Sequence, residues 1–204
     1  MSAPPPPSAP EISDLEIFRS LLLHATVSSI SPSTGAYKEC CATLLSHLQT
    51  LLVPLFPSSS AFLLPEAPAH SPVVVLKIPG LSPSLPHILL NGHYDVVPPG
   101  DLAQWEHPPF AAVVANGRIH GRGAQDMKCV LAGYICALRA LGAANWRPAR
   151  TIVMTLVPDE EIGGAGMAHY LASEFFRGMG GPEGVALALD EGLAGEGEEY
   201  NVYY

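Results

Sequence analysis

Residues 129–157 read CVLAGYICALRALGAANWRPARTIVMTLV and combine a helix pattern with a strand pattern. Four side chains of the first half share one helical face: Leu131, Tyr134, Leu138 and Leu141. Gly142 follows at a position where helices commonly end. TIVMTLV (151–157) is a nearly continuous apolar run, which is typical of a strand covered on both faces. We therefore predict a helix over 129–141 followed by a central strand.

Three further apolar runs have the same character as 151–157. They are VVVLKI (73–78), HILLNG (87–92) and VALALD (185–190). The order of strand, helix and strand between residues 87 and 157 implies a parallel connection. The predicted fold class is therefore α/β, with a mainly parallel sheet flanked by helices.

Local signals place the remaining elements. Ser13 and Glu16 form a capping box ahead of an apolar periodic segment, which predicts a first helix. A second helix is expected over Tyr37–Gln49, and the Pro- and Ser-rich stretch 54–72 is expected to be a surface connection. Asn116-Gly117 lies between FAAVV (110–114) and RIHGR (118–122) and predicts a β-hairpin with a type I′ turn.

The domain organisation follows from composition. With 204 residues and 48% hydrophobic side chains, the chain can bury one substantial core. We expect a Pro-rich tail at 1–12 and one folded domain portion at 13–204.

The charge balance excludes several classes of partner. Nineteen acidic residues against ten basic ones give a net charge of −9, which repels nucleic acid and anionic lipid.

The apolar run Leu21–Leu23 is too short for a signal or membrane-spanning helix. The four cysteines form no CxxC pair, so neither a disulfide scaffold nor a structural zinc site is indicated, and we expect a cytoplasmic protein.

Residues suited to metal binding follow each apolar run. The groups are His93-Tyr94-Asp95 after HILLNG, Asp126 after the hairpin, Asp159-Glu160-Glu161 after TIVMTLV, and Asp190-Glu191 after VALAL. Ligands gather beyond the carboxyl ends of strands in α/β sheets, so these groups are expected to converge. An imidazole among several carboxylates requires a cation, and this set of ligand types suits zinc or a related divalent metal.

Each group taken alone has an ordinary structural explanation. A His-x-Asp pair is commonly a surface hydrogen bond, and two adjacent glutamates commonly form a solvated face. Four such groups, three after apolar runs and one after the hairpin, favour a metal site. The other seven histidines are interpreted as structural: His24, His47, His70, His87, His107, His120 and His169. Since no GxSxG or HExxH motif occurs, a serine nucleophile or a helical zinc motif has no support.

Five segments resemble, in order and spacing, the aminoacylase branch of the zinc peptidase family that also includes carboxypeptidases, dipeptidases and desuccinylases. They are LLNGHYDVVP (89–98), WEHPPF (105–110), GRIHGRGAQDMKCV (117–130), TLVPDEEIGG (155–164) and ALDEGLA (188–194). The resemblance implies the N-terminal part of a phosphorylase/hydrolase-like zinc peptidase catalytic domain. It also implies Zn²⁺ at two sites, with Co²⁺ or Mn²⁺ as further candidates.

The resemblance also implies residue roles. His93 and Asp190 are expected to bind one zinc, Asp126 to bridge both, and Glu161 to bind the other. Glu160 is expected to be the general base that activates the attacking water, and Asp95 to orient His93. The Asp126-Met127 peptide is expected to be cis.

The implied reaction is hydrolysis of an N-acyl-L-amino acid to a free amino acid and a carboxylate. The resemblance also implies a lid domain with the dimer surface and a late histidine of the second zinc site, and we expect this chain to lack both. We therefore expect weak or no activity from the chain alone, an exposed sheet edge, and a homodimer only where the lid is present. The alternatives are a carboxypeptidase or dipeptidase acting on short peptides, and a non-catalytic metal-binding fragment.

Overall fold

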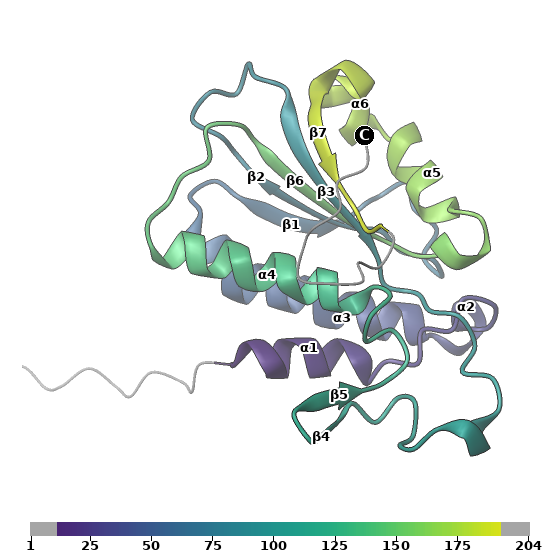
Figure 1. Cartoon of the computed structure of the whole chain (residues 1–204). Coiled ribbons are helices and arrows are strands. Elements are labelled where there is room, and N and C mark those ends of the chain that lie inside the picture. Colours follow the sequence, from purple (N-terminus) through teal and green to yellow (C-terminus); the bar gives the residue numbers. More distant parts are fainter. Residues whose placement is uncertain (1–11, 193–204) are drawn as a thin grey trace, which may run out of the picture.

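The computed structural model describes residues 12–192, so the expected tail at 1–12 falls almost entirely outside the described part. One five-stranded sheet forms the centre, in the order β1-β2-β6-β3-β7 (Figure 1). Its strands are β1 (Ser60–Leu63), β2 (Val74–Ile78), β3 (His87–His93), β6 (Ile152–Val157) and β7 (Val185–Leu189). The four predicted apolar runs are therefore confirmed as strands.

The sheet is mixed, with parallel pairing confined to β6, β3 and the edge strand β7. β3 pairs in parallel with β6 and with β7, while β2 pairs antiparallel with β6 and with β1. The predicted parallel connection runs from β3 through helix α4 (Lys128–Ala143) to β6. β1 lies within the stretch expected to be a surface connection. β1 reads SAFL and is short and partly exposed, so its four residues show no clear strand periodicity.

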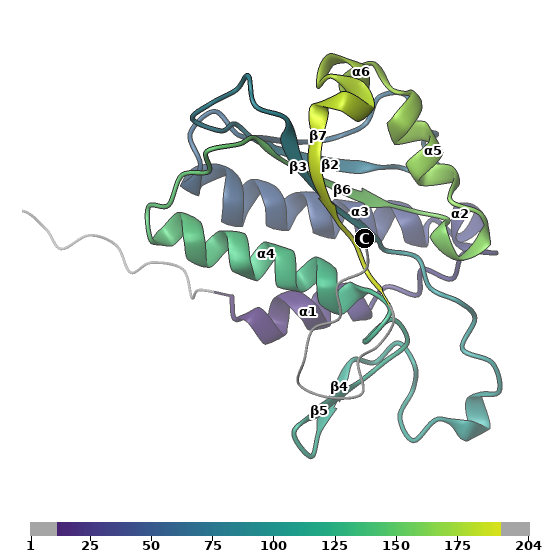
Figure 2. The same ribbon diagram turned by 45° about the horizontal axis from the view of Figure 1, so that its top comes forward.

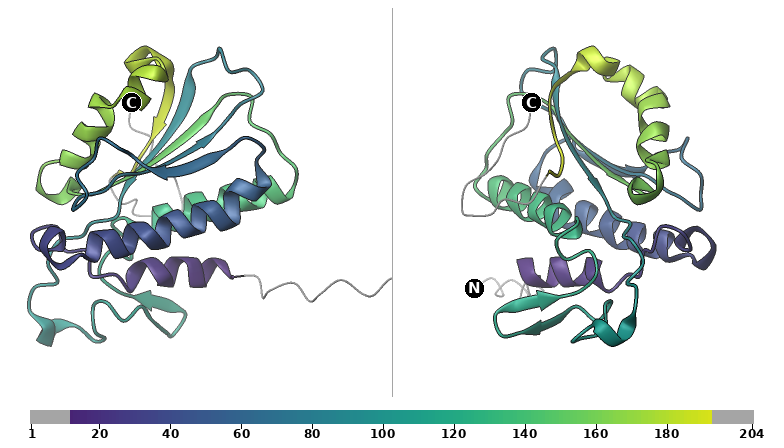
Figure 3. Two further views of the ribbon diagram at one scale, coloured as in Figure 1. Left: turned by 180° about the vertical axis from the view of Figure 1, so that it is seen from behind. Right: turned by 45° about the vertical axis from the view of Figure 1, so that its right-hand side comes forward.

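Helices cover both faces of the sheet. α1 (Asp14–Leu22), α3 (Ala36–His47) and α4 lie on one side, as Figures 1 and 2 show. α5 (Ala165–Ala172) and α6 (Glu174–Gly178) lie on the other side, which is clearest in Figure 3. The nearly continuous apolar runs of β2, β3 and β6 follow from this arrangement, because both faces of these strands are buried. The expectation of two covered faces is wrong for β7, because this strand lies at the edge of the sheet and its residues are mostly exposed.

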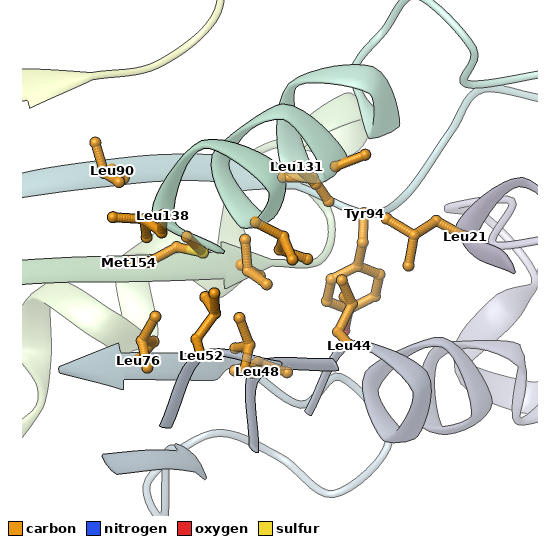
Figure 4. Packing of buried hydrophobic residues seen from close by; sticks show 14 of the residues in the cluster. Leu21, Leu44, Leu48, Leu52, Leu76, Leu90, Tyr94, Leu131, Leu138 and Met154 are labelled. Atoms are coloured by element: carbon orange, nitrogen blue, oxygen red, sulfur yellow. The ribbon is translucent and has the colours of Figure 1, made fainter. Parts of the chain in front are cut away.

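Alternation along β6 shows how one strand serves both cores. Ile152, Met154 and Leu156 pack in the cluster beneath α1, α3 and α4 (Figure 4). Val153 and Val157 point the opposite way and pack with Tyr170 of α5 and Phe176 of α6. The two cores fix the rotation of β6 about its axis, and thereby the direction of the side chains beyond its end.

The predicted local signals are present. The Ser13 hydroxyl accepts a bond from the Glu16 backbone N–H at 3.2 Å, and the Glu16 carboxylate accepts from the Ser13 N–H at 2.9 Å. β4 (Val113–Ala115) and β5 (Arg118–His120) form the predicted hairpin, with positive φ at Asn116 (51°) and Gly117 (73°). The second helix ends at His47 rather than at Gln49, and a π-helical turn continues it over Leu48–Leu52.

Short elements complete the chain. They are α2 (Ser31–Thr34) and 3₁₀ turns at Val53–Leu55, Leu102–Gln104, Glu160–Ile162 and Gly181–Gly184. Across residues 12–192, no helix combines the length and apolar character needed to cross a membrane. β7 is the last strand of the sheet, and its Leu187 and Leu189 side chains are 50% and 44% exposed.

Two glycines of α4 give a matched test of its packing. A Cβ on Gly133 would meet nothing within 4 Å, whereas a Cβ on Gly142 would lie 2.8 Å from Leu55 Cβ and 3.0 Å from the Phe56 ring. We predict that Gly133→Ala raises the free energy of unfolding by roughly 0.5–1 kcal/mol through helix propensity. Gly142→Ala should lower it by roughly 1–3 kcal/mol through overpacking. Urea unfolding measures both, and equal shifts would contradict the described packing.

Candidate metal centre

His93 is the last residue of β3, and its imidazole is buried at the carboxyl edge of the sheet. Its Nδ1 lies 2.9 Å from the Asp95 carbonyl oxygen and 3.3 Å from Asp95 Oδ1. Both neighbours are acceptors, so Nδ1 carries the ring proton and donates it. The lone pair of Nε2 is therefore directed away from Asp95, into the space beyond the strand.

Three carboxylates approach that lone pair. Nε2 lies 3.0 Å from Asp126 Oδ1, 3.3 Å from Glu191 Oε1 and 3.8 Å from Glu160 Oε2. All four groups are acceptors when the carboxylates are ionised and the imidazole is neutral, so they repel one another. A cation among them, or a second proton on the imidazole, relieves this repulsion.

Asp95 joins His93 to the turn that follows β6. Its carboxylate is fully buried and accepts a bond from Ser28 Oγ at 2.8 Å. It also accepts from the backbone N–H groups of Glu160 (3.2 Å) and Glu161 (3.3 Å). One buried carboxylate thus contacts the imidazole and also the backbone of the two consecutive glutamates.

A second buried carboxylate shapes the same turn. Asp159 has a positive φ of 64°, and its side chain accepts from Tyr37 OH at 2.9 Å and from Ser71 Oγ at 3.0 Å. The sequence places Asp159 among the candidates but does not reveal this role, because its two partners are 122 and 88 residues away. Glu160 and Glu161 follow in a 3₁₀ turn from which their side chains reach the His93 region.

The two acidic residues after β7 differ in direction. Asp190, the predicted zinc ligand, accepts a bond from Asn91 Nδ2 at 2.7 Å, and Asn91 in turn accepts from Thr155 Oγ1. Glu191, to which no role was given, faces His93 instead. The structure therefore brings together His93, Asp126, Glu160, Glu161 and Glu191, with Asp95 behind them, and places Asp190 beside Asn91.

Asp126 precedes α4 at the end of the loop that follows the β4–β5 hairpin. The Asp126-Met127 peptide bond is cis, as the resemblance implied. Behind it, the Lys128 ammonium is buried and donates to the carbonyl oxygens of Leu21 (3.0 Å) and His24 (2.8 Å). These bonds attach the start of α4 to the end of α1 and leave the Asp126 side chain 61% exposed.

The ionisable groups show the expected crowding of negative charge. Burial lowers the pKa of His93, but the hydrogen bond and charge of Asp95, with Glu191 and Asp126, raise it overall to about 9. Burial raises the pKa of Glu191 to about 7, although the charge of His93 acts to lower it. Burial and the charge of Asp126 raise the pKa of Glu161. Uptake of protons by these groups is how the site compensates excess negative charge without a cation.

These residues fit a divalent metal. Two overlapping groups have ligand atoms within 4.8 Å of one another, namely His93 with Glu160 and Glu191, and His93 with Asp126 and Glu161. One imidazole nitrogen with several carboxylate oxygens is a donor set that zinc and related divalent metals accept.

The fold and the site together define an α/β domain with a carboxylate-rich centre at the carboxyl edge of its sheet. Residues 89–200 match the Peptidase family M20/M25/M40, and the chain belongs to this family. The chain is 38% identical to aminoacylase-1 of Dictyostelium discoideum over 165 residues, which are 74% of this chain and 39% of that protein. It is 45% identical to aminoacylase-1 of Sus scrofa over 139 residues, which are 67% and 33% of the two chains.

A solved structure agrees on the fold. The M20 family metallo-carboxypeptidase Sso-CP2 from Sulfolobus solfataricus superposes with a TM-score of 0.71 at 24% identity, covering 90% of this chain and 38% of that one. The chain thus spans between a third and two fifths of the length of these relatives.

Replacement of Asp95 tests the orientation of the centre. Asp95→Asn replaces one of the two carboxylate oxygens by an amide N–H₂. Either the imidazole and the Glu160 N–H at Oδ1, or Ser28 and the Glu161 N–H at Oδ2, then lose their acceptor. We predict that Zn²⁺ binds about 10–100-fold more weakly. Isothermal titration measures this change, and exposed Asp101→Asn is the control that should leave affinity unaltered. Unchanged affinity in Asp95→Asn would refute the positioning role.

Proposed function

We propose that this chain carries the catalytic base and most of the metal ligands of an amidohydrolase acting on N-acyl-L-amino acids. The observation that carries the proposal is the placement of Glu160. Its carboxylate is half exposed, lies 3.8 Å from His93 Nε2, and is positioned by the backbone bond to Asp95. A base at the open side of a metal centre is the arrangement that amide hydrolysis requires.

The metal ligands follow from the same geometry. His93, Asp126 and Glu161 would hold one divalent ion, and Glu191 is the next carboxylate within reach of His93. The resemblance makes Asp190 a zinc ligand. In the structure its carboxylate accepts a bond from Asn91, so binding zinc would require the carboxylate to rotate. We propose zinc as the metal, with cobalt or manganese as substitutes, since carboxylate-rich sites discriminate little among them.

The reaction consumes one water and breaks one amide bond. A bound divalent metal supplies polarisation of the carbonyl and a lowered pKa of water. Glu160 accepts the proton of the attacking water and then donates it to the departing amine nitrogen. Asp95 stabilises the His93 tautomer that leaves Nε2 free. The products are a carboxylate and a free amino acid.

The aminoacylase-1 relatives support the substrate class, and the cysteines support a cytosolic setting. Cys40, Cys41, Cys129 and Cys136 are all free thiols, which suits a reducing compartment. The substrates are proposed to be small amides, and dimerisation through a lid domain of the relatives is part of the same proposal.

Glu160→Gln tests the mechanism. The amide is nearly isosteric but cannot take the proton, so we predict that hydrolysis of N-acetyl-L-methionine falls at least about 100-fold while metal content stays equal. Free methionine and bound metal are measured in the same preparation, with exposed Glu183→Gln as the matched control. Retained turnover would refute the role as base, and loss of metal would make Glu160 a ligand instead.

Substrate class is tested on the parent protein. N-acetyl-L-methionine should be hydrolysed faster than the dipeptide L-alanyl-L-methionine under identical metal loading. The opposite order would favour a peptidase. Metal binding without turnover of either substrate would show that the chain alone is a metal-binding portion of the enzyme.

A further inference from the structure

A second group of metal-type side chains lies outside the centre described above. Glu106, His107 and His120 each offer a ligand atom, and these atoms lie within 4.8 Å of one another. We name these three residues the hairpin cluster, because they lie at the β4–β5 hairpin and on the connection that precedes it, beneath α1 in the view of Figure 1. None of them belongs to either group around His93.

The two imidazoles of the cluster are in direct contact. Their ring centroids are 4.6 Å apart and their planes meet at 76°. His107 Nε2 lies 3.7 Å from Glu106 Oε1, which is beyond hydrogen-bond distance. His107 Nε2 is also buried, and no group within residues 12–192 forms a hydrogen bond with it. A buried imidazole nitrogen without a partner, facing a carboxylate and a second imidazole, is a polar atom that lacks a ligand.

The backbone around the cluster is well fixed. Trp105 Nε1 donates to the Pro99 carbonyl at 2.9 Å, and the Arg122 guanidinium lies over the Trp105 ring, 5.3 Å from its centroid. The backbone N–H of Arg122 donates to the Pro109 carbonyl at 2.7 Å. His120 is the last residue of β5 and lies opposite Val113 of β4. The connection and the hairpin are therefore joined on both sides of the three side chains.

The ligand atoms of the three side chains lie within 4.8 Å of one another, so we infer that side-chain rotation can bring them to one ion. The Glu106 side chain is 73% exposed and free to rotate, so its carboxylate can approach without a backbone shift. Two imidazole nitrogens and one carboxylate oxygen form a donor set that zinc uses with a fourth position open. Glu106 also supplies a negative charge that offsets part of the charge of the ion.

We propose that the hairpin cluster binds a second divalent cation of the Zn²⁺ class, through Glu106, His107 and His120. This cation joins the β3–β4 connection to the strand that leads into the Gly121–Asp126 loop. The site is distinct from the centre at His93 and does not depend on the proposed hydrolysis.

Metal content tests the proposal. The parent chain, His107→Gln/His120→Gln and the control His70→Gln/His169→Gln are dialysed against the same free Zn²⁺ concentration, and zinc per chain is measured. We expect the cluster variant to bind one zinc fewer than the parent and the control variant to equal the parent. Equal zinc in the parent and the cluster variant would overturn the proposal. Circular dichroism without metal verifies that all three chains share one fold.

A second measurement needs no substitution in the cluster. Long-range ¹H–¹⁵N spectra of the parent chain follow each imidazole during titration with Zn²⁺ alone. His107 and His120 resonances should shift together and saturate, and they should still do so in His93→Gln, where the other centre is disabled. Shifts confined to His93 would overturn the cluster site. Because turnover is not read, a failure here is separate from a failure of the proposed hydrolysis.

Discussion

The buried carboxylate of Asp95 is the constraint on which the candidate site depends. A carboxylate removed from water is costly unless hydrogen bonds compensate it, and Asp95 finds its donors in three separate segments. These donors are Ser28 Oγ, the His93 imidazole, and the backbone N–H groups of Glu160 and Glu161. The N-terminal segment, the end of β3 and the turn after β6 therefore lie in one arrangement because each supplies part of the compensation.

Asp159 extends this principle to the opposite side of the turn. Its carboxylate accepts from Tyr37 and Ser71, so α3 and the approach to β2 also determine where the glutamates lie. Tyr37 in turn packs edge-on against Tyr94, the residue between His93 and Asp95. The inner carboxylates are satisfied by the protein, whereas Glu160, Glu161 and Glu191 have no comparable donors among residues 12–192 and remain available to a cation. Burial thus decides which carboxylates stabilise the structure and which are available to bind a metal ion.

The sequence predicts most of the fold because the responsible signals are local. The apolar runs, the capping box at Ser13 and the Asn116-Gly117 turn each act within a few residues, and each is confirmed. β1 is not predicted, because an edge strand is decided by its neighbour rather than by its own periodicity. The roles of Ser28 and Asp159 are likewise invisible in the sequence, since their partners are distant along the chain.

Asp190 and Glu191 illustrate a finer limit. The pairing of β3 with β7 shifts by one residue between His87 and Ile88. His87 lies opposite Val185, whereas Ile88 lies opposite Leu187. A shift of one residue reverses the face that each later side chain of a strand occupies. Which of two adjacent carboxylates reaches His93 therefore depends on a bulge that apolar periodicity does not encode.

The loop that carries Asp126 connects the two metal-type clusters. On its C-terminal side, Lys128 fixes the start of α4 to the carbonyl groups at the end of α1. On its N-terminal side, the hairpin contacts the same helix, since Arg19 Nε donates to the Ala112 carbonyl at 3.1 Å. Between these attachments, the Gly121–Asp126 segment lines an open hollow of about 490 Å³. A cation at the hairpin cluster would add a further attachment on the N-terminal side of this segment, and would thereby restrict where Asp126 can present its carboxylate.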